Sequence, residues 1–472
     1  METERLPLRG QLIYAAGSLG WSVVVNVVAG MLIYFYQPIA DPDLKNLLPK
    51  IVMLGFLPLL TMILLGTRLM DAVIDPIIAF FSDKSDHKKG RRVPFMLYSL
   101  IPVLVFGLLL YMPLQKAESY DNAWWLVSIL LCFNISISFY VIPYNALLPE
   151  LGHTSEEKLR ISTFQSIAYS VGLIIAASAN SFVEIYENIF HIQEKFRAYQ
   201  YAIWTIMLIG WIFLLVPPLF LNEKKYSVAK PIKEPIFKSF AEVAKNKNLF
   251  LYLFSDFTYF ISITLIGSGA QYYVKALLKI DERHGTGMVA TMILLAIVFS
   301  PFVYMLARKF SKKTLVLISL FVLSFMFLFV YYLGNLGLNN VTEAYVIGVA
   351  LAFPVAFLGI LPPVILAELT HYDSYITKQN KEATYFGIRS FFIQVGQTLG
   401  VVVFTILIGL LPDQGLGKWL AGMFPDVPFE ELGIRLSGIF GFVLCLLATL
   451  IFAFFRYKKM MTGLKEMENA EK

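Results

Sequence analysis

Residues 66–95 read GTRLMDAVIDPIIAFFSDKSDHKKGRRVPF, and this stretch decides the class of fold. Up to residue 81 it is mostly apolar, and it continues an apolar run that begins at residue 51. A helix needs about 20 mostly apolar residues to cross a bilayer. Residues 82–94 then contain five lysines and arginines, and such basic loops favour the cytoplasmic side. The stretch therefore predicts a membrane-spanning helix that ends at the inner surface.

The composition of the whole chain agrees with this prediction. Of its 472 residues, 57% are hydrophobic and 15% are charged, against about 45–50% and about 25% in soluble domains. The apolar runs are too long for the strands of a membrane barrel, and they lack the alternation of such strands. We therefore predict an all-α integral membrane protein.

Twelve apolar runs are long enough to cross a membrane as helices, in which each backbone polar group is satisfied within the segment. The predicted spans are 12–36, 51–81, 95–113, 124–148, 161–183, 201–221, 249–274, 287–307, 314–334, 344–369, 385–411 and 434–456.

The distribution of lysine and arginine gives an independent check on these spans. If the N-terminus lies inside, the inner segments hold 27 of the 39 lysines and arginines, and the outer segments hold 9. The other three, Arg68, Arg389 and Arg435, lie within spans. Cytoplasmic loops are enriched in these residues, so the bias supports an even number of spans with both termini in the cytoplasm. We expect a multi-pass protein of the plasma membrane, which would be the inner membrane in a bacterium.

The longest inner loop divides the chain into equal numbers of spans. It covers residues 222–248, contains seven lysines, and follows the sixth predicted span. Two six-helix halves around a site near the bilayer midplane are the arrangement of the major facilitator fold. We therefore predict an N-terminal half at 1–221, a cytoplasmic loop at 222–248, a C-terminal half at 249–456 and a cytoplasmic tail at 457–472.

Charged residues in the second span mark a candidate cation site. Arg68, Asp71 and Asp75 are spaced three and four residues apart, which puts them on one face of a helix. Charges within a membrane are costly, and they usually face a cavity or a partner. Two carboxylates held in a medium of low dielectric would bind a proton or recruit Na⁺. The alternative is a buried ion network that only fixes helix packing.

The inner end of the second span and the fourth span also carry candidate residues. Asp83, Arg91 and Arg92 could pair across a gate that opens and closes in each cycle, or they could belong to a solvated basic loop. In the fourth span, Tyr144 and Asn145 follow a proline and could line a polar cavity. The alternative for the fourth span is a kinked helix whose polar groups only pack against neighbours.

The sequence argues against an enzyme or a pump driven by ATP. All five histidines fall in predicted loops and form no metal-ligand spacing, and no glycine-rich phosphate-binding loop appears. The net charge of +6 is explained by the inner loops and by anionic lipid, not by nucleic acid. We expect no cofactor and no obligate protein partner; the expected partners are a small-molecule solute, a coupling cation and membrane lipids.

Four segments of the sequence resemble the glycoside–pentoside–hexuronide:cation symporters of the major facilitator superfamily. Three of them are PYNALLPEL at 143–151, LPPVILAELTHYDSY at 361–375 and EATYFGIRSFFIQVGQTLG at 382–400. The most specific lies in the second span and the loop after it, and its matching residues are Arg68, Asp71, Ala72, Asp75, Pro76, Ser82, Asp83, Gly90, Arg91 and Arg92. The resemblance spreads over both halves.

The resemblance implies a coupling site for Na⁺, Li⁺ or H⁺. It gives the role of cation ligand to Asp71 and Asp75, and it places the hydroxyl of Ser138 in the same site. An asparagine of the family pattern is Ile74 here. The loss of that amide makes proton coupling more credible.

The sugar-binding positions depart from the family. Charged residues that contact sugar in the family align with Ser22 and near Gln165, while a lysine aligns with Val395, beside Gln394. A galactoside bound in the usual manner is therefore not expected. The residues predicted to contact the solute are Arg68, Trp21, Ser22, Tyr144, Asn145, Gln165 and Gln394.

We expect a secondary symporter that moves a small organic solute, such as a sugar or a glycoside-like compound, by alternating access. The alternative is a carrier of lysolipids with the same fold, because similar second-span aspartates occur in lysophospholipid carriers and apolar positions such as Val141 would suit an acyl chain.

Overall fold

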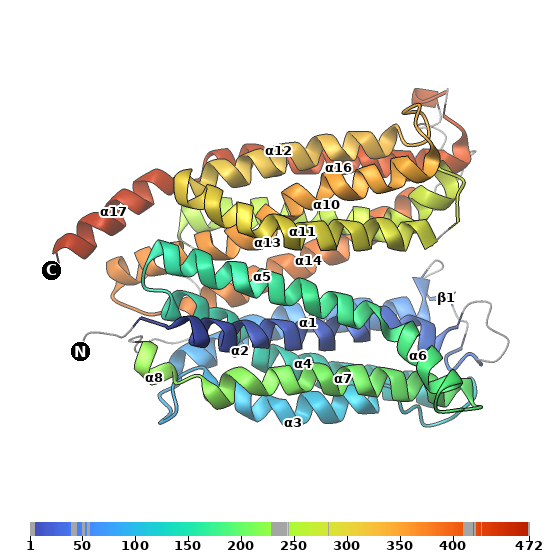
Figure 1. Cartoon of the computed structure of the whole chain (residues 1–472), viewed down its shortest axis with the longest axis horizontal. Coiled ribbons are helices and arrows are strands. Elements are labelled where there is room, and N and C mark those ends of the chain that lie inside the picture. The colour runs from blue at the N-terminus through green and yellow to red at the C-terminus, as the bar shows by residue number, and fades with distance from the viewer. Residues whose placement is uncertain are drawn as a thin grey trace. The chain divides into compact units, whose positions relative to one another are not determined.

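The chain folds almost entirely into helices, as a computed structural model shows (Figure 1). The structure describes residues 5–38, 45–49, 52–53, 57–227, 243, 245–281, 283–408, 419, 422–425 and 427–470. Two compact units share the chain. The first contains Met1–Phe240 and Asp373–Phe391, and the second contains Ala241–Tyr372 and Phe392–Lys472. The predicted domain boundaries stay a prediction.

The helices of the first unit begin and end close to the predicted spans. They are α1 (Leu8–Tyr36), α2 (Leu59–Lys84), α3 (Val93–Leu109), α4 (Tyr120–Leu151), α5 (Ser155–Ala177), α6 (Ala179–Asn188), α7 (Lys195–Phe220) and the short α8 (Glu223–Tyr226). The first turns of α14 (Glu382–Ile408) also belong to this unit.

The second unit holds the remaining described helices. They are α10 (Lys247–Tyr272), a π-helical turn η1 (Tyr273–Leu277), α11 (Arg283–Lys309), α12 (Lys312–Tyr331), most of α13 (Asn340–Thr377), the rest of α14, α16 (Phe429–Ala453) and α17 (Tyr457–Ala470).

Each predicted span falls on a helix, so the prediction of twelve helices in an all-α membrane fold is confirmed. Ten helical segments of the described residues are long and apolar enough to cross a membrane by themselves. The two other predicted spans correspond to α3, which is short at 17 residues, and α2, which carries Arg68, Asp71 and Asp75. Both helices pack against α4, which covers part of their surface.

The predicted start of the second span was wrong. Among the described residues of this stretch, β1 (Val52–Met53) pairs antiparallel with β2 (Leu57–Pro58), and α2 begins at Leu59. Leu57 precedes a proline, and the proline ring disfavours the helical conformation for the residue before it. The apolar composition of this segment concealed the local stop signal.

Close packing of α1 in the first unit depends on glycine. This helix lies beside α5 and α7 (Figure 1). A Cβ atom added to Gly20 would lie 2.6 Å from the backbone nitrogen of Leu214 in α7, and one added to Gly172 in α5 would lie 2.6 Å from the carbonyl oxygen of Leu19. Small residues allow membrane helices to approach closely, since little hydrophobic driving force acts between helices in lipid. These glycines therefore allow α5 and α7 to pack closely against the part of α1 that contains Trp21 and Ser22.

The helix α17 shows that the C-terminal segment is docked on the second unit. Tyr457, Met460 and Leu464 are buried, and their spacing places them on one face. A Cβ atom added to Gly463 would lie 3.1 Å from the ring of Tyr372. The segment predicted as a cytoplasmic tail is therefore part of the folded unit.

The substitution Gly20→Ala is expected to destabilise the purified protein by about 1–3 kcal/mol, because its methyl group meets backbone atoms that cannot move aside. Gly30→Ala is the matched control: it lies in the same helix with nothing within 4 Å of the added Cβ atom, and it should leave stability unchanged or raise it slightly. Thermal unfolding in detergent measures both. Equal melting temperatures for the two variants would contradict this account of the α1–α7 contact.

Candidate functional site

Asp75 lies at the centre of a buried polar site in the first unit. Its carboxylate is 1% exposed. The hydroxyl of Ser138 in α4 donates to Asp75 Oδ1 at 2.6 Å, and the hydroxyl of Ser390 in α14 donates to Oδ2. The structure thus brings together two of the predicted cation ligands, Asp75 and Ser138.

Asp71 lies one turn earlier on the same face of α2 and makes a parallel contact. It is 7% exposed, and Asn134 Nδ2 donates to its Oδ2 atom at 2.8 Å. Asn134 and Ser138 are themselves one turn apart on α4, so the two helices match turn for turn. The other oxygen of Asp71, Oδ1, is buried and has no hydrogen-bond partner among the residues that the structure describes.

A small apolar cluster holds the helices of this site in register. Its buried members come from α2, α4 and the first turn of α14: Ile78, Ala79, Ile142, Ala146 and Ala383. Gly387 permits the approach of α14, because a Cβ atom there would lie 2.5 Å from the methyl group of Ala79. Because the alanines of this cluster are small, α2 and α4 approach closely, and Asp75 meets Ser138 one turn away.

Sequence reasoning missed two residues of this site. Asn134 could have been found, since it lies four residues before Ser138 and therefore on the same face of a helix. Ser390 gave no such signal, because it is 315 residues from Asp75 and a single serine beside Arg389 is unremarkable in sequence.

The predicted solute residues of α1 lie against α5. The ring of Trp21 lies 4.8 Å from that of Tyr169, centroid to centroid, and Trp21 is half-buried. Ser22 is fully buried, and its hydroxyl donates to the carbonyl oxygen of Tyr169 at 2.6 Å. Asn26, one turn on, donates to the carbonyl oxygen of Ser22 at 2.8 Å. Trp21 and Ser22 both contact Tyr169, so they join α1 to α5, and their role in solute binding stays a prediction.

Tyr144, predicted to contact the solute, packs against Tyr14 of α1. It is fully buried, its ring stacks on Tyr14 with centroids 4.4 Å apart, and each hydroxyl donates to the other residue's carbonyl oxygen. These paired bonds join α1 to α4. The neighbouring Asn145 points differently: it is half-buried, and its Oδ1 atom accepts from Gln165 Nε2 at 3.0 Å. Asn145 and Gln165, both predicted to contact the solute, thus lie together.

Two further predicted residues lie apart from these pairs. Arg68 is exposed on α2, one turn before Asp71, where its charge acts on that carboxylate. Gln394 is half-buried and belongs to the second unit.

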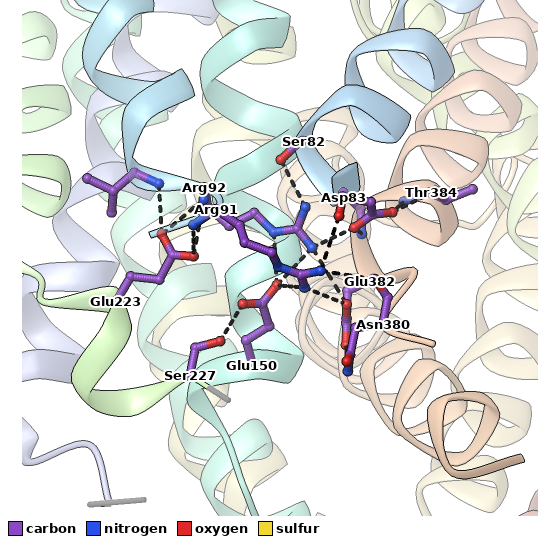
Figure 2. Close-up of polar contacts among 12 residues, drawn as sticks. Ser82, Asp83, Arg91, Arg92, Glu150, Glu223, Ser227, Asn380, Glu382 and Thr384 are labelled. Carbon is purple, nitrogen blue, oxygen red and sulfur yellow. Dashed lines mark hydrogen bonds and ion pairs between the residues drawn. The ribbon is translucent and has the colours of Figure 1, made fainter. Parts of the chain in front are cut away.

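Arg92 is the centre of a second site, at the end of α2. Its side chain is fully buried. Its Nη2 atom lies 2.6 Å from Asp83 Oδ1, its Nε atom donates to Glu150 Oε1 at 2.8 Å, and Nη1 donates to Ser82 at 2.9 Å (Figure 2). A guanidinium satisfied by planar, charge-assisted bonds is stable away from water.

Arg91 extends the same network to the segment before α14. Its Nη2 atom lies 2.9 Å from Glu150 Oε1 and 3.1 Å from Glu382 Oε2, and Nη1 donates to the carbonyl oxygen of Asn380 at 3.2 Å (Figure 2). Glu150 and Glu382 were not among the predicted gate residues. The network, which we call the inner cluster, consists of Asp83, Arg91, Arg92, Glu150 and Glu382.

Asp83 also caps α14. Its carboxylate accepts hydrogen bonds from the backbone nitrogens of Ala383 at 3.1 Å and Thr384 at 2.7 Å, and from the Thr384 hydroxyl at 2.6 Å. A carboxylate is favourable at a helix N-terminus, where backbone N–H groups lack partners. Asp83 is thus fully buried and not solvated, so the predicted grouping of Asp83, Arg91 and Arg92 holds in space.

The second unit contains a comparable ion pair. Lys312 Nζ at the start of α12 lies 2.8 Å from Glu368 Oε1, and the Tyr457 hydroxyl donates to Glu368 Oε2 at 2.8 Å. All three residues are buried. The docked helix α17 therefore supplies one partner of Glu368.

Helices of membrane length and a buried acidic pair are features of a membrane protein with a polar site inside its helices. Among the described residues, no group of three His, Cys, Asp or Glu side chains could hold a metal ion. The chain matches the MFS/sugar transport protein family over residues 13–459, and it belongs to that family. It is therefore a transporter and not an enzyme.

Two named relatives are similar to the chain over most of its length, and a third over about a third of it. A glucuronide carrier protein homolog of Escherichia coli is 22% identical over 87% of this chain and 87% of that protein. A sphingosine-1-phosphate transporter of Xenopus tropicalis is 24% identical over 70% of this chain and 68% of that protein. An uncharacterized symporter of Synechocystis is 29% identical, but the match spans 30% of its length and 36% of this chain.

A solved structure gives the same fold. The E. coli fucose:proton symporter superposes with a TM-score of 0.59 at 13% identity, covering 94% of this chain and 99% of that one. At this identity the likeness concerns the fold alone.

Replacement of Arg92 is expected to be more damaging than replacement of any exposed residue of the same loop. Arg92→Ala takes away the guanidinium that Asp83 and Glu150 share and leaves two buried acids with fewer positive partners, which should cost about 3–5 kcal/mol of stability. Arg92→Lys keeps the positive charge but lacks the planar guanidinium, so its loss of stability should lie between that of Arg92→Ala and zero. Thermal unfolding of the purified protein measures this, with the exposed Lys88→Ala as control. A melting temperature for Arg92→Ala like that of Lys88→Ala would contradict the assignment.

Proposed function

We propose that this transporter is a cation-coupled symporter in which Asp71 and Asp75 bind the coupling Na⁺ or H⁺. The observation that carries the proposal is the buried carboxylate pair with neutral donors: Asn134 on Asp71, and Ser138 and Ser390 on Asp75. Hydroxyl and amide oxygens can turn to face a cation, whereas a hydroxyl hydrogen or an amide N–H can face a carboxylate when the site is empty. Such a site switches between two states at low cost.

The chemistry of the pair supports either ion. Two carboxylates in a medium of low dielectric repel each other and favour uptake of a positive charge. Na⁺ would take oxygen ligands from Asp71, Asp75 and Ser138, while a proton would reside on one carboxylate. Asp71 Oδ1, buried and without a hydrogen-bond partner among the described residues, provides the acceptor that either ion requires.

The inner cluster supports transport by alternating access, with Asp83, Arg91 and Arg92 as gate residues. It ties the loop after α2 to the segment before α14 by ion pairs and by the Asp83 cap. Ion pairs and capping bonds can be exchanged for water when a gate opens. The cluster would hold the cytoplasmic side closed while the site is loaded from outside.

The solute we propose is a sugar or glycoside-like compound. The support comes from the glucuronide carrier homolog and from neutral polar side chains, since Trp21, Asn145 and Gln165 are half-buried and suited to hydroxyl groups. Arg68 would orient the solute beside Asp71, and Gln394 is the candidate contact from the second unit.

The proposed setting is the plasma membrane, with both termini in the cytoplasm and membrane lipids as neighbours. The bias of lysine and arginine toward the inner loops supports this orientation. No cofactor is proposed beyond the coupling cation.

The substitution Asp75→Asn is expected to abolish uptake driven by a cation gradient, because the amide neither binds a proton nor offers a negative charge. Purified protein in vesicles, with an imposed Na⁺ or H⁺ gradient and a panel of labelled sugars and glycosides, measures this. Uptake that remains gradient-dependent in the variant would contradict the assignment of Asp75 as a ligand of the coupling cation. Uptake of a lysolipid and of no sugar would leave coupling intact and replace the solute class.

The pair Ser138 and Ser136 allows a matched comparison on α4. With Na⁺ as the coupling ion, Ser138→Ala removes an oxygen ligand beside Asp75 and should raise the Na⁺ concentration needed for half-maximal uptake by about tenfold. Ser136→Ala removes a hydroxyl that only donates to the carbonyl oxygen of Cys132, so it should have little effect. The cation dependence of uptake separates them, and identical curves would remove Ser138 from the site.

A further inference from the structure

Glu223, which no sequence motif singled out, holds the backbone from which both gate arginines project. Its carboxylate accepts from the backbone nitrogens of Arg91 at 2.6 Å, Arg92 at 2.9 Å and Val93 at 2.9 Å (Figure 2). The side chain is 2% exposed, and it comes from α8, just after α7. Three successive N–H groups thus converge on one carboxylate at the start of α3.

The local sequence is built for this contact. Gly90 has a φ angle of +117°, which side chains rarely allow, and a Cβ atom there would lie 2.2 Å from Glu223 Oε2. Glycine therefore serves twice: it turns the chain so that the following N–H groups converge, and it leaves room for the carboxylate. Converging N–H groups of this kind form a concave site for an anion.

The short helix that carries Glu223 is itself fixed to the inner cluster. The hydroxyl of Ser227 donates to Glu150 Oε2 at 2.6 Å, and the Ser227 nitrogen closes the turn of α8 onto the carbonyl oxygen of Glu223 at 2.8 Å. Glu150 in turn accepts from both arginines. The segment 223–227 thus contacts the inner cluster twice, through the arginine backbones and through Glu150.

Glu223 contacts the two gate arginines through their main chain. Burial, followed by the negative charge of Glu150, raises the pKa of Glu223 above its ordinary value, while its bonds to backbone N–H groups act in the opposite direction. Its hydrogen bonds run to the main chain of Arg91 and Arg92, whose side chains face Glu150. Its effect on the gate is therefore exerted through the placement of that main chain.

We propose that Glu223 is a positioning residue of the inner gate: by holding the N–H groups of residues 91–93 it directs both arginine side chains onto Glu150, Asp83 and Glu382. The inference rests on the proposed function of the inner cluster as a gate. A purely structural cap of α3 would contribute to stability alone. A positioning residue controls whether the gate opens while the rest of the molecule stays folded.

Cysteine labelling at two buried positions of the full-length protein distinguishes a positioning role of Glu223 from a purely stabilising one. Ala383 is fully buried beside the cluster in the first unit, so a thiol introduced by Ala383→Cys reports opening of the gate. Cys445 is fully buried in the second unit and reports global unfolding. Cys132, which is half-buried, is removed by Cys132→Ser. The rate of reaction with N-ethylmaleimide is then measured at each thiol, without any solute or ion gradient.

Glu223→Ala is expected to speed labelling at position 383 by about tenfold or more, the factor that loss of one charge-assisted hydrogen bond produces, and to leave Cys445 unreactive. Glu223→Gln, which keeps one acceptor oxygen, should lie between Glu223→Ala and the parent. In an Arg92→Ala background, Glu223→Ala should increase the labelling rate at position 383 only slightly, because both residues act on the same inner cluster. Asp86→Ala, an exposed acid in the same loop, is the matched control and should match the parent.

Three results would overturn the proposal: an unchanged rate at position 383, equal acceleration at both thiols, or additive effects of Glu223→Ala and Arg92→Ala. The labelling pattern is independent of uptake. Its failure therefore refutes the positioning role alone, whereas uptake without gradient dependence refutes the cation coupling alone.

Discussion

The high cost of a buried charge without a partner is the constraint on which the first unit depends. Arg92 is fully buried, and it is tolerated there because Asp83, Glu150 and Ser82 surround its guanidinium. Those partners come from the ends of α2 and α4, and Asp83 in turn caps α14. One side chain therefore fixes where three helices end or begin.

The helix α2 carries two kinds of buried acid, and the difference between their partners separates two tasks. Asp71 accepts a hydrogen bond from the amide of Asn134, and Asp75 accepts one from the hydroxyl of Ser138. Asp83, two turns further along, is neutralised by Arg92 and by the N-terminus of α14. The proposed cation site thus lies on the same helix as the inner cluster, two turns away from it.

The second unit repeats part of this design with other residues. A basic residue at the start of a helix, Lys312, pairs with an acid near the inner end of a proline-containing helix, Glu368, as Arg92 pairs with Glu150. The surrounding sequences VIPYNALLPEL at 141–151 and ILPPVILAEL at 360–369 are alike. Internal repeats are typical of this class of carrier. In the second unit a tyrosine of α17 completes the pair, which explains why that segment is ordered.

The sequence alone determined the membrane-spanning helices of the described residues and the acidic face of α2, because hydropathy and helical spacing are local properties. It placed Asp83 with Arg91 and Arg92 for the same reason. Only the tertiary structure decided that Ser390 meets Asp75, that Glu223 holds the arginine backbones and that Tyr144 is buried against Tyr14. These pairs join segments about 130 to 315 residues apart, and their choice depends on how each helix is rotated against its neighbours. No local pattern encodes that rotation, since it is set by packing of small residues between helices.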